Sequence, residues 1–164
     1  MDRAERASLQ WQKERPGTEL EPMVILGRLM EATNRISEDH IAPVFRQNGL
    51  KAGEFDVLAT LRRSGEPYAL TPTQLYRAMM ISSGGMTARL DRLEKAGLVR
   101  RRPHPEDRRG VLIELTGDGY ALIDRMLPDY LEVQKAVVSS LQPAERAELA
   151  RLLGRLIEGV SCEG

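Results

Sequence analysis

The stretch from Leu70 to Gly119 constrains the fold more than any other part of the sequence. Residues 71–74 read Thr-Pro-Thr-Gln, which combines an N-terminal cap, a proline suited to a first turn and a capping-box glutamine. A short helix is therefore expected to begin there and to end near residue 80. A second helix is expected from a cap at Ser82 or Ser83 to about residue 96, where Gly97 ends it.

Two short apolar segments follow this pair of helices. Residues 98–100 and 111–115 predict strands, and residues 103–107, which include two prolines, predict the loop between them. The chain is therefore expected to return on itself as a hairpin. Two helices in tight succession followed by a hairpin predict a winged helix-turn-helix.

Helical periodicity covers most of the remaining sequence. Apolar residues recur at intervals of three and four, and helix-breaking or capping residues separate the periodic segments. We expect helices at residues 1–15, 21–47, 51–63 and 116–139, and a last helix that begins at 142. The predicted fold class is mainly α with a small β hairpin.

The composition is that of one soluble globular domain. Of 164 residues, 41% are hydrophobic and 29% are charged. No apolar run approaches the roughly 18 residues of a membrane span, and Met1 is followed by charged residues rather than by an apolar signal segment. The single cysteine, Cys162, excludes an intramolecular disulfide and a cysteine-cluster zinc site. We expect a cytoplasmic protein without a metal or cofactor.

Positive charge is concentrated in the second helix and the hairpin. The whole chain has 24 basic and 24 acidic residues, which taken alone weakens a nucleic-acid interpretation. Between Arg89 and Arg109, however, eight basic residues stand against four acidic ones, an excess of +4. Such a run is usually a solvated face, but here it coincides with the helix-turn-helix. The basic residues are Arg89, Arg92, Lys95, Arg100, Arg101, Arg102, Arg108 and Arg109.

The second helix of the pair has the pattern of a recognition helix. On a helical wheel Met86, Leu90 and Leu93 share one face, which must pack on the domain. The opposite side is small and polar, so the backbone can approach a groove, and hydroxyls near the N-terminus suit phosphate oxygens or base edges. From this helix we expect Ser82, Ser83, Thr87, Arg92 and Lys95 to contact DNA.

The tip of the hairpin carries Arg108 and Arg109. A loop at that position can reach the flanking minor groove, where concentrated negative potential favours arginine. The alternative is a solvated turn in which both arginines pair with Glu106 and Asp107. The adjacent helix favours DNA contact by both arginines.

The same segment resembles the MarR family of bacterial transcriptional regulators, and the order of the helices matches over about residues 20–160. The resemblance rests on residues 75–99, with Ser82–Thr87 and Arg89–Glu94, and on Asp107–Gly110 followed by Leu115, Thr116 and Gly119.

The resemblance implies a homodimeric repressor that binds double-stranded DNA. It places dimerisation helices at 20–48 and 117–164, a winged-helix lobe at 51–116 and an additional helix at 1–17, all within a single domain. The recognition helices would read a palindromic operator with half-sites roughly 34–36 Å apart. The implied targets are the regulator's own gene and a divergent efflux transporter gene. The apolar terminal helices fit a dimer, but they could also cover their own core.

The additional N-terminal helix resembles a urate-responsive subgroup of the family. In that subgroup the effector site is formed by a tryptophan on the additional helix, an aspartate and an arginine on the third helix, and an arginine on the recognition helix. The matching residues are Trp11, Asp56, Arg63 and Arg89. The implied effector is urate or a related purine such as xanthine.

The residues themselves leave a structural alternative open. Arg89 lies on the inward flank of its helix, where an unpaired charge is costly, and Asp56 and Arg63 share a face of the third helix. An Arg89–Asp56 ion pair would satisfy the arginine without a ligand, and Trp11 could be a packing anchor. Another aromatic acid or a phenolic compound could also replace the purine.

Other classes of function find less support in the sequence. His40 and His104 lie far apart, and no Ser/His/Asp order, glycine-rich phosphate loop or His-x-x-x-His pair is present, so an enzyme is not expected. A protein-interaction module would not require Ser82-Ser83-Gly84 together with Arg108. Oxidant-sensing family members use a cysteine in the N-terminal half, whereas Cys162 is near the end, so a redox response is not expected.

Overall fold

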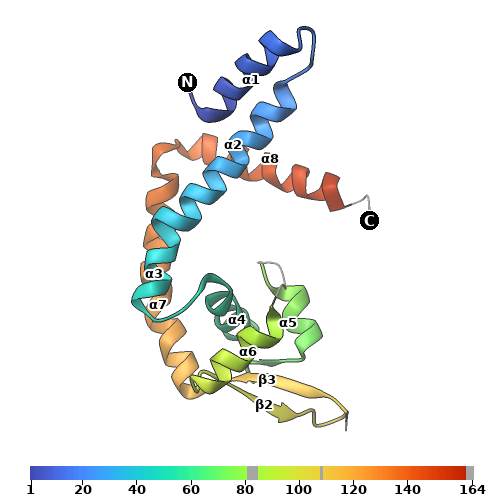
Figure 1. The fold of residues 1–164 in the computed structure, drawn as a ribbon. Helices are drawn as coiled ribbons and strands as arrows, with labels where there is room; N and C mark the ends of the chain where they lie inside the picture. The colour runs from blue at the N-terminus through green and yellow to red at the C-terminus, as the bar shows by residue number, and fades with distance from the viewer. Residues whose placement is uncertain (81–84, 108, 162–164) are drawn as a thin grey trace. The chain divides into compact units, whose positions relative to one another are not determined.

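The computed structural model describes residues 1–80, 85–107 and 109–161. These residues form two compact units, residues 1–126 and 127–164. The predicted fold class is confirmed, because the chain is mainly helical and has one small antiparallel sheet (Figure 1). Among the described residues, no helix combines the length and the apolar character that a membrane span requires.

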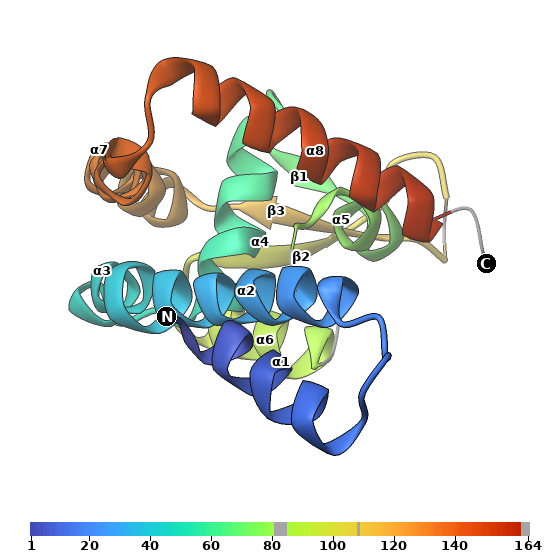
Figure 2. The same cartoon turned by 90° about the horizontal axis from the view of Figure 1, so that it is seen from above.

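The first unit begins with two helices that lie alongside each other, α1 (Arg3–Glu14) and α2 (Glu21–Arg35), as Figures 1 and 2 both show. Asp2 caps α1 by accepting a hydrogen bond from the backbone N–H of Glu5 at 2.8 Å. Its carboxylate also accepts one from the Nε of Arg28 on α2 at 2.7 Å. Both interactions lower the pKa of Asp2, the backbone hydrogen bond more strongly.

The long helix predicted from 21 to 47 is helical throughout but not uniform. A π-helical segment, Ile36–Ile41, separates α2 from α3 (Ala42–Gln47). Pro43 explains the change, because a proline has no N–H to donate to the preceding turn. The wider turn lets the N–H of Ala42 reach the carbonyl of Ser37 instead.

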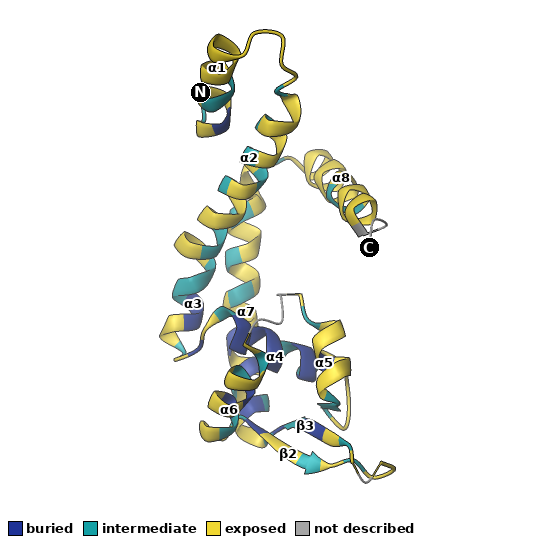
Figure 3. Ribbon diagram, turned by 45° about the vertical axis from the view of Figure 1, so that its right-hand side comes forward, coloured by how far each residue is buried: buried dark blue, intermediate teal, exposed yellow. Residues whose placement is uncertain are grey.

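Helix α4 (Ala52–Arg63) is the centre of the core, and Figure 3 draws most of it in the colour of buried residues. Its apolar side chains are almost completely covered, and Phe55 stacks on Phe45 of α3 with 4.7 Å between ring centroids. A helix buried on most sides has to be contacted by several other elements. The elements that contact it most are α3, α5, α6 and β3.

The helix-turn-helix consists of α5 (Pro72–Ala78) and α6 (Met86–Lys95). The expected capping box of α5 is present, since Thr71 accepts from the N–H of Gln74 at 3.2 Å and Gln74 accepts from the N–H of Thr71 at 2.9 Å. Helix α6 begins at Met86 after Gly85, later than predicted. The cap expected at Ser82 or Ser83 lies outside the described residues.

The sheet has three strands in the order β1-β3-β2 rather than a simple hairpin. Strands β2 (Val99–Pro103) and β3 (Val111–Leu115) form the wing, with Arg101 opposite Ile113. Strand β1 (Ala69–Leu70) pairs with the other edge of β3, and Leu70 lies opposite Ile113. Two residues are too few to show an alternating pattern, so the sequence did not predict β1.

Helix α7 (Gly117–Val137) begins as predicted with a Thr116 cap, which accepts from the N–H of Gly119 at 3.0 Å. Arg62 of α4 binds Asp124 of α7 at 2.8 Å and lies over the Tyr120 ring, 4.3 Å from its centroid. These contacts join α4 to the first half of α7.

The second unit contains the rest of α7, a 3-10 turn at Val138–Ser140 and α8 (Pro143–Ser161). The apolar side of α8 is exposed in the chain taken alone. Its exposed large side chains are Leu149, Leu152, Leu156, Ile157 and Val160.

Candidate DNA-binding surface and effector site

Helix α6 presents the faces that the sequence predicted. Leu90 and Leu93 are buried, whereas Thr87 and Lys95 are exposed. Among the described residues, no ion pair engages the ammonium group of Lys95, so its charge is available to a phosphate.

Arg92, also predicted to contact DNA, is bound inside the unit. Its Nε donates to the Glu54 carboxylate at 2.6 Å. Glu54 is almost completely buried on α4, while about half of the Arg92 side chain remains exposed. The other carboxylate oxygen of Glu54 accepts from the N–H of Lys51 at 2.9 Å. Glu54 therefore joins the start of α4 to the recognition helix.

Three arginines of β2 are paired as well. Arg100 and Arg102 lie on one side of the strand and share Glu114 of β3, at 2.9 and 3.1 Å. The hydrogen bond from Arg100, with a smaller contribution from the Arg102 charge, lowers the pKa of Glu114. These two pairs lie within the wing.

Arg101 points to the opposite side of β2, because side chains alternate along a strand. Its guanidinium donates to Asp91 at 2.6 Å and to the carboxylate of Glu94, both on α6. The Glu94 carboxylate also accepts from the backbone N–H of Arg101 at 2.9 Å. The hydrogen bond with Asp91 is the main cause that raises the pKa of Arg101. Arg101 thus fastens the wing to the recognition helix.

The wing tip is closed by backbone hydrogen bonds around Asp107. The carboxylate of Asp107 accepts from the N–H of Arg109 at 2.9 Å, and its carbonyl accepts from the N–H of Gly110 at 2.9 Å. The Arg109 side chain is exposed, and within the described part of the chain no carboxylate pairs with its guanidinium. Arg108 lies outside the described residues.

These pairs change the interpretation of the basic stretch. Several of its basic residues are paired with carboxylates of the same unit, so only part of its positive charge is available to DNA. Four of the eight basic residues have such partners: Arg92, Arg100, Arg101 and Arg102. Among the described basic residues of this stretch, Lys95 and Arg109 have the charges most available to a phosphate.

Asp56 and Arg63, two of the predicted effector residues, both hold the end of α5. The carboxylate of Asp56 accepts from the N–H of Met80 at 3.0 Å. The guanidinium of Arg63 donates to the carbonyl of Ala78. Two side chains of α4 thus hold the end of α5 and the residues directly after it, at Ala78 and Met80.

Arg89, the third of these residues, packs against the start of α4. A Cβ atom placed on Gly53 would lie 2.3 Å from the Cζ of Arg89, so the guanidinium occupies the space that the glycine leaves. This confirms that Arg89 faces inward. The predicted ion pair with Asp56 stays a prediction.

Trp11, the fourth, lies on α1, which packs against α2. Its side chain is 49% exposed, so the chain taken alone does not enclose the indole as a packing anchor would be enclosed. The participation of Trp11 in a site with the other three residues stays a prediction.

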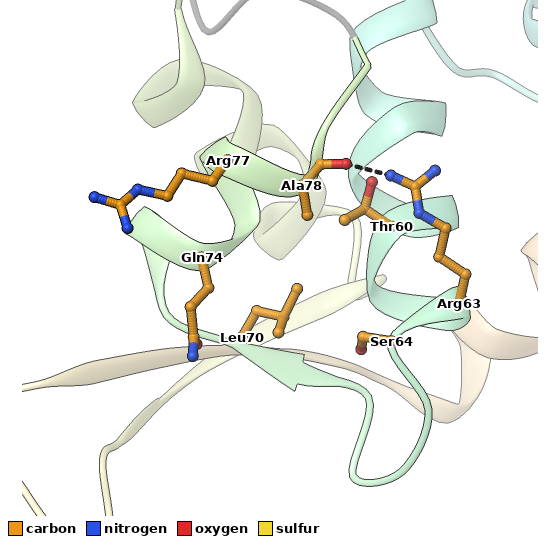
Figure 4. Close-up of a pocket in the computed structure, with 7 residues that line it drawn as sticks. All are labelled: Thr60, Arg63, Ser64, Leu70, Gln74, Arg77 and Ala78. Carbon is orange, nitrogen blue, oxygen red and sulfur yellow. Dashed lines mark hydrogen bonds between the residues drawn. The ribbon is translucent and has the colours of Figure 1, made fainter.

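An open cavity of about 550 Å³ lies between α4, α5 and β1 (Figure 4). Its size is within the range of small-molecule sites. Arg63 contributes to its wall, whereas Asp56 and Arg89 do not. The lining residues are Thr60, Arg63, Ser64, Leu70, Gln74, Arg77 and Ala78. The described residues hold no cluster of three or more acidic, histidine or cysteine side chains arranged for a metal ion.

Comparison with known proteins identifies the family. A model of the MarR family matches residues 48–110. The HTH-type transcriptional regulator PecS of Dickeya dadantii is 44% identical over 147 residues, which cover 90% of this chain and 88% of that protein. The chain belongs to the MarR family.

Solved structures agree with this assignment. A MarR family transcriptional regulator from Streptomyces coelicolor, determined in complex with DNA, matches with a TM-score of 0.77 at 26% identity, over 87% of this chain and 89% of the other. BpsR of Bordetella bronchiseptica, whose DNA binding is regulated by 6-hydroxynicotinic acid, matches with a TM-score of 0.67 at 30% identity, over 80% and 97%. The chain is therefore a MarR-type DNA-binding transcriptional regulator.

The sequence did not reveal every residue that shapes this MarR-type site. The partners of the arginines, Glu54 and Glu114, are distant from them in sequence or lie on another strand, so no local pattern points to them. Thr60 and Arg77 line the cavity only because α4 and α5 pack side by side. One sequence pattern did point to this cavity. Thr60, Arg63 and Ser64 are spaced by three and four residues at the end of α4, which places them on the same side.

Proposed function

We propose that this MarR-type regulator is a homodimeric repressor that urate or a related purine releases from DNA. It binds a palindromic operator and controls its own gene and a divergent efflux transporter gene. The observation that carries the proposal is that Asp56 and Arg63 bind Met80 and Ala78 at the end of α5, the first helix of the helix-turn-helix.

The proposed DNA contacts combine the exposed side of α6 with the wing. Lys95 and Arg109 supply phosphate or minor-groove contacts, and Thr87 supplies a hydroxyl near the helix N-terminus. Arg92 adds to them with the part of its guanidinium that Glu54 does not engage. Three further proposed contacts are outside the described residues: Ser82, Ser83 and Arg108.

The proposed switch follows from the contacts around α4. A planar purine anion beside Trp11 attracts Arg63 and Arg89 through charge-assisted hydrogen bonds and repels Asp56. Arg63 then leaves the carbonyl of Ala78, and Arg89 leaves its place on Gly53. Both changes loosen the link between α4 and the recognition helix, so the half-site spacing no longer fits the operator.

Two comparisons support an effector of this class. The four residue types of the urate-responsive subgroup are all present, at Trp11, Asp56, Arg63 and Arg89. BpsR, a relative of similar fold, is regulated by 6-hydroxynicotinic acid, which is also a small planar aromatic acid. A planar acid with an anionic edge is the chemistry that two arginines recognise best.

Exposed apolar side chains support the homodimer. The terminal helices present large aliphatic residues to solvent in the chain taken alone, and a second copy would cover them. On α2 these are Met23, Ile25, Leu26 and Met30. On α8 they include Leu152, Leu156 and Ile157.

Binding to DNA is tested by a gel-shift titration against the region upstream of the regulator's own gene. Salt-sensitive binding at nanomolar to micromolar protein is expected, and Arg108→Ala should weaken it without unfolding the protein. An absence of binding at all salt concentrations would contradict the repressor, and an unchanged affinity of Arg108→Ala would remove Arg108 from the contacts.

Binding of the effector is tested by fluorescence, because Trp11 is the single tryptophan. Its emission should change on titration with urate or xanthine. Arg89→Ala should reduce the urate response more than it reduces DNA binding. A flat titration together with DNA release that urate does not affect would refute the purine effector.

A further inference from the structure

The hydroxyl of Thr60 is buried, and no described residue forms a hydrogen bond with it. Thr60 is 1% exposed, and its Oγ1 has no partner among the described residues. A hydroxyl that leaves water without a partner costs free energy, so such groups are rare in protein interiors. A valine of nearly the same shape would avoid that cost at this position. The threonine therefore indicates that the hydroxyl has a ligand as its hydrogen-bond partner.

This hydroxyl lies in the wall of the cavity between α4 and α5. Figure 4 draws it beside the hydrogen bond from Arg63 to Ala78. The seven lining residues include two arginines, Arg63 and Arg77, and no carboxylate. Leu70 and Ala78 add apolar surface. A cavity with cationic donors, an apolar wall and an unused hydroxyl suits a small planar organic anion.

We propose that this cavity receives the anionic edge of the effector and that Thr60 is one of its hydrogen-bond partners. The inference rests on the proposed effector response but places the anionic edge against Thr60 rather than against Arg89, and so names residues that the comparison with the urate-responsive subgroup does not include. Arg63 belongs to both sets. The Thr60 hydroxyl donates to an anionic oxygen, and Arg63 supplies the positive charge beside it.

Binding in this cavity requires Arg63 to move. In the free protein its guanidinium donates to the Ala78 carbonyl at the end of α5. An anion in the cavity offers Arg63 a charged acceptor in place of that carbonyl, and charge-assisted hydrogen bonds are the stronger kind. The same movement uncovers Thr60 and frees the end of α5. Ligand binding is thereby linked to the position of the end of α5, the helix that precedes the recognition helix in the chain.

The test is Thr60→Val in the full chain, with urate, xanthine and salicylate as probes in isothermal titration calorimetry. Because the hydroxyl has no hydrogen-bond partner in the described part of the chain, the variant should melt at the same temperature as the wild type or higher. Its affinity for the probe that the wild type binds should fall about three- to tenfold, as one lost hydrogen bond predicts. Thr33→Val is the matched control, since the Thr33 hydroxyl is bonded to Leu29 on α2 and should leave probe affinity unchanged.

A second variant tests the same cavity by filling it. Ala78→Leu keeps a good helix former at the end of α5 and places a larger side chain in the cavity while Thr60 remains. It should abolish binding of the probe. Thr60→Val and Ala78→Leu affinities equal to that of the wild type would overturn the inference, as would a clear drop in the melting temperature of Thr60→Val.

The outcomes separate this inference from the proposed function. If Arg63→Gln loses urate binding while Thr60→Val and Ala78→Leu retain it, the effector response stands and the cavity is not its site. If no probe binds the wild type, both the purine effector and the cavity inference fail. Gel-shift binding to the upstream DNA, which needs no effector, tests the repressor independently of either result.

Discussion

At the scale of single residues, the recognition helix depends on what α4 places beneath it. The guanidinium of Arg89 occupies the space over Gly53, and the carboxylate of the next residue, Glu54, holds Arg92 at 2.6 Å. Two consecutive residues of one helix therefore position two arginines of another. This arrangement turns Arg89 inward and leaves about half of the Arg92 side chain exposed.

Gly53→Ala should displace Arg89 without unfolding the protein. The added Cβ would overlap a flexible guanidinium rather than the backbone, and alanine stabilises a helix relative to glycine, so stability should change by no more than about 1 kcal/mol. The urate response should weaken several-fold or more, as measured by DNA release.

Gly154→Ala on α8 is the matched control, because a Cβ there meets nothing within 4 Å. It should leave the urate response unchanged. A Gly53→Ala protein with a normal urate response would show that the position of Arg89 does not matter to the switch.

Lys95→Ala should weaken DNA binding equally for all sequences, because we propose that its ammonium group contacts a phosphate rather than a base. The slope of log affinity against log salt should become shallower by about 1. Anisotropy titrations at several salt concentrations measure this. Lys13→Ala, which removes an exposed lysine from α1, is the control. An unchanged slope for Lys95→Ala would place this lysine away from the phosphates.

At the scale of elements, the sequence predicted what local patterns specify. The capping box at Thr71 and Gln74, the cap at Thr116 and the turns at Gly49 and Gly97, both with positive φ, are all present. Each of these signals acts within a few residues.

Features that depend on distant partners were not predicted. The π-helical segment before Pro43 arises from a missing N–H, and β1 exists because β3 offers a free edge. The predicted positive surface was only partly right, because a count of charges cannot show which arginines have carboxylate partners. The cavity beside Thr60 likewise depends on how α4 and α5 pack.

Arg101→Ala tests the link between the wing and α6. The substitution removes hydrogen bonds to Asp91 and Glu94, and since the Arg101 side chain is about a third exposed, the loss of stability should be about 1 kcal/mol. DNA affinity should fall as well, because the wing is no longer held against the recognition helix. Urea denaturation and anisotropy titrations measure the two effects.

Arg100→Ala separates this link from the general loss of an arginine. Arg100 pairs with Glu114 within the wing rather than with a carboxylate of α6. Arg100→Ala should therefore reduce DNA affinity less than Arg101→Ala does. Equal losses for the two variants would argue against a positioning role for Arg101.

At the scale of the whole molecule, the exposed apolar sides of the terminal helices favour association with a second copy of the chain. Leu156→Glu on α8 should shift the proposed homodimer toward monomer, because a carboxylate would enter an apolar interface. Light scattering after size-exclusion chromatography measures the mass. Ala147→Glu adds the same charge on the opposite side of α8 and should leave the mass unchanged. A wild-type mass for Leu156→Glu would exclude this side of α8 from the interface.

The central claim is that effector binding and DNA binding are coupled through α4, and reciprocity tests it most directly. The affinity for upstream DNA is measured with and without saturating urate, and the affinity for urate is measured with and without saturating DNA. Linkage requires the same factor in both directions. We predict that each ligand weakens the other by about 5- to 150-fold. If both bind and neither affects the affinity of the other, the account of this protein as a urate-released repressor is wrong.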